Sequence, residues 1–206
     1  RISIIIGLFT SSFTLALLPH LLEAIDQENL SLISSFQKNF FWISDLTIVL
    51  FFAFSELICY VVLGSNFKGA FTILGFYIIH PVYKASYNLV SVGIWKSNKT
   101  YLSTLTTLLS CFLNIVLSIV LIKLIGLNGV SVATGISSLF WIITTSVISE
   151  KIYNTGFNIN SFFNDKLILI FCLGIMTLLF SVINSNLIKY SGVFTTITFY
   201  GMYIWK

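Results

Sequence analysis

The chain has 206 residues, of which 57% are hydrophobic, 16% aromatic and only 9% charged. Its mean hydropathy of +0.98 excludes a water-soluble globular protein, because too few polar residues are available to cover such a surface. The net charge of +4 does not indicate nucleic-acid binding, since the basic residues are scattered and form no patch.

Seven apolar stretches follow one another along the chain, and most can cross hydrocarbon about 30 Å thick. They lack the alternating pattern of membrane β-barrels, so helices are the expected way to satisfy the backbone in lipid. We predict an all-α, polytopic transmembrane helix bundle of about six full spans plus a truncated seventh. The stretches are residues 2–22, 42–63, 70–95, 101–124, 129–149, 167–185 and 192–206.

The link between the first two stretches has a helical pattern of its own. Apolar residues such as Ile25, Ile33 and Phe40 recur at helical spacing, with charged residues between them. This pattern predicts a surface helix at about residues 23–40, and we interpret it as an amphipathic connector rather than a binding element. Placing this link in the cytoplasm gives a weak positive-inside bias, to which Lys166 contributes.

The third stretch carries a polar stripe. A Lys near the middle of a bilayer costs about 2.5 to 3.5 kcal/mol on insertion scales, so Lys84 should face a partner or water. We predict a wet cavity along the stripe; the alternative is that Lys84 reaches the headgroups by snorkelling. Pro81 also removes a backbone bond and predicts a kink where it frees the carbonyl of Tyr77. The residues on the polar side are Tyr77, His80, Lys84, Asn88 and Ser91.

Glu56 in the second stretch is expected at a depth similar to that of Lys84 and His80. We predict that it pairs with one of them when no substrate is bound; otherwise it faces an aqueous vestibule. Glu56 is the only acid that we expect deep in a stretch, and Lys84 is the only Lys. Glu56 is therefore the candidate carrier of a coupling proton or sodium ion.

The fourth stretch presents a file of hydroxyl and amide groups at helical spacing. Such groups would hydrogen-bond sugars, or bond neighbouring helices at about 0.6 kcal/mol each, and we favour helix packing. Small residues on one face of the fifth stretch, Gly129, Ala133 and Ser137, also predict close helix packing. The file comprises Ser103, Thr107, Ser110, Asn114 and Ser118.

The three cysteines, Cys59, Cys111 and Cys172, have no paired spacing with His or with one another. We interpret them as small buried hydrophobic residues. The sequence predicts no metal site, no cofactor and no catalytic residue.

The run from Asn114 to Ser137 resembles a signature of bacterial polysaccharide (O-antigen) flippases. These belong to the multidrug/oligosaccharidyl-lipid/polysaccharide exporter superfamily, and their signature reads Asn-x-x-Leu…Gly-x-x-Gly-Ala-x-x-Ala-Thr-x-x-Ser. Here Gly126, Gly129, Ala133 and Thr134 stand at matching positions. Weaker matches are Leu18-Pro19, Leu63-Gly64 and the link 93–99. The resemblance covers residues 1–150 well and the remainder only in hydropathy.

The resemblance implies a transporter in the bacterial cytoplasmic membrane, and not an enzyme. Its partners would be membrane lipid and an undecaprenyl-diphosphate-linked oligosaccharide, moved between leaflets for surface polysaccharide. The chain would be the C-terminal lobe of a two-lobed alternating-access transporter, with lobe helices in residues 1–150 and trailing membrane helices in 151–206. Lys84 and His80 would contact the diphosphate. The other expected cavity residues are Glu56, Tyr77, Asn88, Thr107, Ser110 and Asn114.

Three other functions stay open at this point. A drug or metabolite exporter of the same superfamily would share these helices. A membrane-embedded glycan polymerase or ligase would also have many helices, but we expect it to carry a large external loop, and the links here are short. A purely structural membrane subunit is the third.

Overall fold

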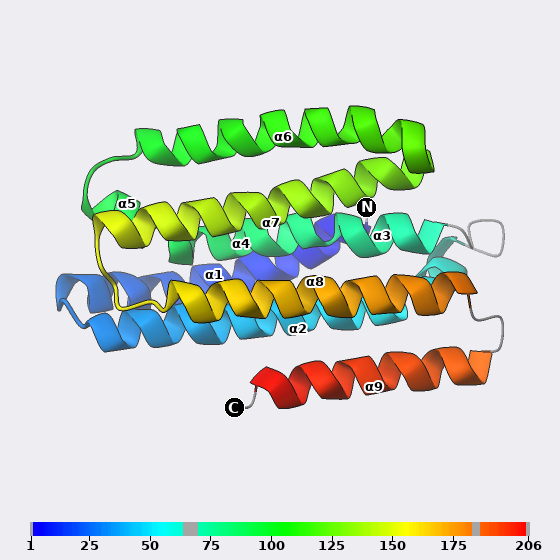
Figure 1. The fold of residues 1–206 in the computed structure, drawn as a ribbon. Coiled ribbons are helices and arrows are strands. Elements are labelled where there is room, and N and C mark those ends of the chain that lie inside the picture. The colour runs from blue at the N-terminus through cyan, green and yellow to red at the C-terminus, as the bar shows by residue number, and fades with distance from the viewer. Residues whose placement is uncertain (1, 64–69, 183–185, 205–206) are drawn as a thin grey trace.

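The computed structural model describes residues 2–63, 70–182 and 186–204, and within these ranges the chain folds into helices without strands. The all-α prediction is confirmed. Figure 1 shows the long helices lying side by side as a bundle. The helices are α1 (Ile2–Asp26), α2 (Leu30–Leu63), α3 (Phe71–Tyr77), α4 (Ile79–Val90), α5 (Val92–Lys96), α6 (Tyr101–Ile125), α7 (Leu127–Ile152), α8 (Ile159–Val182) and α9 (Asn186–Ile204).

Four helices of the described chain are long and apolar enough to cross a membrane. Multi-pass membrane insertion is therefore compatible with the structure, whereas the predicted count of about six spans stays a prediction. α6 is the most open of the four, because no residue in its most apolar window is buried. Its surface is available to lipid tails. The candidate spans are Leu30–Val62, Tyr101–Ile125, Leu127–Ile152 and Ile159–Leu178.

The separate surface helix predicted at residues 23–40 does not form. α1 continues through Pro19 to Asp26, and α2 begins at Leu30 after a short turn in which Glu28 has a φ of 53°. The side chain of Asn29 accepts a hydrogen bond from the Leu32 backbone N–H and caps α2. The helical spacing was read correctly, but its apolar face packs against protein. The buried residues of this cluster are Leu21, Ala24, Ile25, Ile33, Phe40, Leu89 and Val92.

The third apolar stretch is broken into α3, α4 and α5. α3 ends at Tyr77, four residues before Pro81, where the sequence predicted a break because Pro81 cannot bond the Tyr77 carbonyl. Pro81 itself lies in the first turn of α4, where a missing N–H is tolerated. A second interruption follows at Ser91, whose hydroxyl donates to the Tyr87 carbonyl at 2.9 Å.

α6 and α7 form a closely packed hairpin at one edge of the bundle, with α9 at the opposite edge (Figure 1). Gly129 lies so close to the backbone of Leu121 that any Cβ there would overlap it, and Ala133 is fully buried. This confirms the packing predicted for the small-residue face. The main core lies between α2, α4, α7, α8 and α9.

Candidate functional site

An open groove of about 730 Å³ lies between α1, α4, α6 and α7. The structure brings Lys84, His80 and Asn88 from α4 together there with Thr107 from α6. Lys84 and His80 are exposed, while their neighbours Tyr83 and Ser86 are buried on other sides of α4. The complete lining is Ser11, Thr14, Leu15, His80, Lys84, Ala85, Tyr87, Asn88, Ser103, Thr104, Thr107, Leu108 and Trp141.

Aromatic rings form one wall of the groove. The Trp141 ring on α7 stacks on Tyr87 with centroids 4.9 Å apart and lies 6.3 Å from the ring of His80. His80 Nδ1 shares a hydrogen bond of 3.0 Å with the Ser138 hydroxyl, which orients the imidazole against α7. The wall therefore offers a flat ring surface beside two basic groups.

Two polar atoms of the groove lack hydrogen-bond partners among the described residues. They are the indole N–H of Trp141 and the hydroxyl of Ser103, and both are buried at the atom level. Buried polar groups are normally paired, but these two atoms have almost no accessible surface, so the polar contacts that the groove offers come from its more exposed lining residues.

Ser110 and Asn114 are not among the residues that line the groove. The Ser110 hydroxyl donates to the Ser137 carbonyl at 2.7 Å, and Asn114 donates to the Ser137 hydroxyl at 2.8 Å. Ser118 in turn bonds to Asn114. This part of the file holds α6 to α7, which is the packing alternative favoured from the sequence. Only its beginning, Ser103 and Thr107, faces the groove.

The remaining predicted residues, Tyr77 and Glu56, also lie outside the groove lining. Tyr77 is exposed at the end of α3. The predicted pairing of Glu56 with Lys84 or His80 is not formed, because among the described residues no ion pair joins Glu56 to either of them. The reason is geometric, because α2 packs on the side of α4 that carries Ser86, and Lys84 turns to another side.

A buried ion pair joins α2 to α8. Lys166 Nζ contacts the two carboxylate oxygens of Asp45 at 2.6 and 2.5 Å, and the Tyr83 hydroxyl donates to Asp45 at 2.8 Å. The exposed fractions of Lys166 and Asp45 are 1% and 2%. The rings of Phe41, Tyr83 and Phe162 surround the ammonium at 4.8 to 5.0 Å, a distance at which cation–π attraction acts.

This ion pair corrects two expectations from the sequence. Lys84 and Glu56 are not the only charged residues to consider inside the bundle, because Lys166 and Asp45 are almost fully buried between α2 and α8. Lys166 therefore does not belong with the loop residues that set the positive-inside bias. Asp45 and Lys166 each stand near the end of an apolar stretch, where charged residues are common. Their opposite charges were therefore the only feature of the sequence that indicated a pair.

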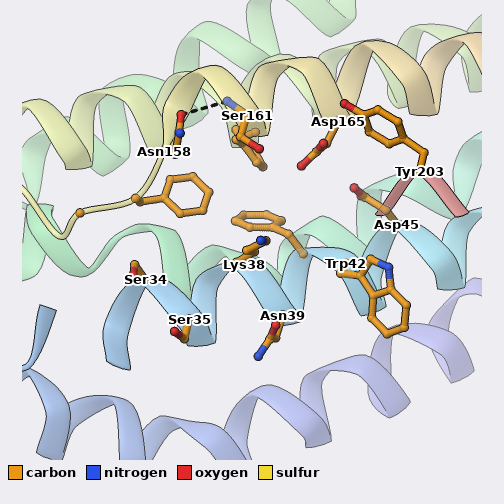
Figure 2. A pocket seen from close by; sticks show the side chains of 14 residues that line it. Ser34, Ser35, Lys38, Asn39, Trp42, Asp45, Asn158, Ser161, Asp165 and Tyr203 are labelled. Atoms are coloured by element: carbon orange, nitrogen blue, oxygen red, sulfur yellow. Dashed lines mark hydrogen bonds between the residues drawn. The ribbon is translucent and has the colours of Figure 1, made fainter. Parts of the chain in front are cut away.

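A second cavity, of about 600 Å³, lies between residues 34–45 of α2, the first two turns of α8 and the end of α9 (Figure 2). Within the described ranges, no group of three or more His, Cys, Asp or Glu could hold a metal ion. The cavity is lined by Ser34, Ser35, Lys38, Asn39, Phe41, Trp42, Asp45, Gly156, Phe157, Asn158, Ser161, Phe162, Asp165 and Tyr203.

No protein-family model, curated protein or solved structure matches the chain.

Proposed function

We propose that this chain belongs to a transporter of lipid-linked oligosaccharides in the bacterial cytoplasmic membrane. In this proposal it forms the C-terminal lobe of an alternating-access flippase, and the groove receives the undecaprenyl-diphosphate end of the substrate. The observation that carries the proposal is the convergence of Lys84, His80, Asn88 and Thr107 in one open groove.

The charge of the groove suits a diphosphate. Hydrogen bonds from a cationic donor to a phosphate oxygen are about twice as strong as neutral ones, and Lys84 is the exposed cation of the groove. The groove lining contains no Asp or Glu, so its charge does not favour the cationic compounds that many drug exporters take. An anionic headgroup is the better match.

The groove and its surroundings also offer surfaces to the sugars and the polyprenyl tail of the substrate. The ring wall at Trp141 and Tyr87 offers apolar contact to a sugar, and the exposed Thr107 hydroxyl and the Asn88 amide offer it hydrogen bonds. The apolar surface of α6 lies beside the groove and is open to a polyprenyl tail. An open groove with these contacts supports transport rather than catalysis.

The test is transfer of a labelled lipid-linked oligosaccharide between leaflets, measured with the complete transporter in vesicles. Lys84→Gln should lower the transfer rate at least about tenfold, the equivalent of one charge-assisted hydrogen bond of about 1.4 kcal/mol. Lys123→Gln is the matched control, because Lys123 is an exposed α6 residue outside the groove. Unchanged transfer by the Lys84 variant would remove the groove from the substrate path.

A further inference from the structure

We propose that the second cavity, between α2, α8 and α9, binds the headgroup of a membrane phospholipid that carries both a phosphate and a primary ammonium. Phosphatidylethanolamine is such a lipid. The site is separate from the groove, and the inference does not depend on the proposed transport function.

The two walls of this cavity carry opposite charges. Lys38 projects from α2 and Asp165 from α8, and Figure 2 shows both side chains directed into the space between these helices. Their charges act on each other, yet neither is in an ion pair with any described residue. A ligand with neighbouring negative and positive groups would satisfy both walls at once.

Other polar side chains line the cavity near Lys38 and Asp165. Asn39 also lines the cavity, but Figure 2 shows its side chain on the other side of α2 from that of Lys38, so Lys38 is the donor for phosphate oxygens. Tyr203 lines the cavity from the end of α9, and its hydroxyl can accept a hydrogen bond from an ammonium N–H group. Asp45 also lines the cavity, but Lys166 already neutralises it. Asp165 is close enough to Lys166 to feel its charge, but it forms no ion pair with a described residue and is the cavity carboxylate that a ligand can bind.

The position of the cavity points to a lipid as the source of the headgroup. It lies at the end of the bundle where α2 and α8 begin, next to the polar link 153–158. Trp42 and Tyr203 line it, and these residue types concentrate where the headgroups of a bilayer meet its hydrocarbon. A volume of about 600 Å³ is in the range of small-molecule sites.

The experiment is native mass spectrometry of the full chain in detergent, titrated with one lipid at a time. Phosphatidylethanolamine should bind about tenfold more tightly than phosphatidylcholine, whose quaternary ammonium has no N–H to donate, and than phosphatidylglycerol, which has no ammonium. Equal binding of the three lipids would overturn the proposal.

Variants of Lys38 and Asp165 test whether the lipid headgroup binds in this cavity. Asp165→Asn and Lys38→Gln should each weaken phosphatidylethanolamine binding about tenfold, whereas Lys123→Gln on α6 should leave it unchanged. If either variant loses helical content, Asp165→Glu and Lys38→Arg replace it and should retain binding. Undiminished binding by the charge-removing variants would place the lipid elsewhere. Displacement of the lipid by an equal concentration of free phosphoethanolamine would assign the cavity to a soluble ligand and overturn the lipid assignment.

Discussion

The Asp45–Lys166 pair is the contact in which single residues matter most. It is almost fully buried, it bridges α2 and α8, and Tyr83 ties α4 to the same carboxylate. Removing one charge of such a pair leaves the other without compensation, which costs about 3 to 5 kcal/mol. Replacing both charges by apolar groups of similar size is often neutral or stabilising, because no charge then needs to be desolvated.

Lys166→Met should therefore lower the free energy of unfolding by about 3 to 5 kcal/mol, and the double change with Asp45→Leu should recover most of that loss. Unfolding in detergent, followed by circular dichroism, measures both effects. Lys38→Met is the control, because Lys38 is exposed and has no ion pair with a described residue. A single variant as stable as the parent chain would show that the pair contributes little.

Sequence patterns predicted the groove residues but not the buried ion pair. Helical spacing placed His80, Lys84 and Asn88 on one side of a helix, and the structure has them in one groove. The same spacing could not find the partner of Lys166, because Asp45 is 121 residues away along the chain. A pattern within one helix gives the side on which a residue lies, but not the helix that covers this side.

At the scale of elements, the hairpin of α6 and α7 shows what local patterns predict well. The small residues of α7 let it approach the α6 backbone, and Ser110 and Asn114 add hydrogen bonds across the contact. The link at residues 23–40 shows what local patterns cannot predict. Its apolar face was read correctly, but protein and lipid are both apolar, so the pattern did not reveal that α1 and α2 bury it.

Ala133→Leu should destabilise the hairpin by about 1 to 3 kcal/mol, because Ala133 is fully buried and the added methyl groups have no space. The amount of folded protein in the membrane and its unfolding free energy both report the change. Ile136→Leu on the same helix is the control, since Ile136 is exposed and its volume is conserved. Equal losses in the two variants would mean that α7 tolerates no change, rather than that Ala133 is a contact position.

At the scale of the whole molecule, α4 separates two polar regions. One side of α4 meets α2, where Tyr83 joins the buried ion pair, and another side faces the groove with Lys84. Composition predicted the helical class, because long apolar runs in lipid leave the backbone few alternatives. It did not predict this division, which depends on the packing of α1, α2 and α7 around α4.

The two sides of α4, one facing the groove and the other packed on α2, predict which positions water reaches. In a chain whose three native cysteines are replaced, Lys84→Cys and Thr107→Cys should react rapidly with a membrane-impermeant thiol reagent, because both positions line the open groove. Ser86→Cys is the matched control on α4: Ser86 is fully buried against Ser44 of α2 and should stay unlabelled. The reaction needs a thiolate, which forms in water and not among lipid tails, so labelling separates a wet groove from a lipid-facing one. Vesicles of known orientation also show from which side the reagent enters. If position 84 stays unlabelled from both sides while the protein remains folded, the groove faces lipid and Lys84 reaches the headgroups by snorkelling.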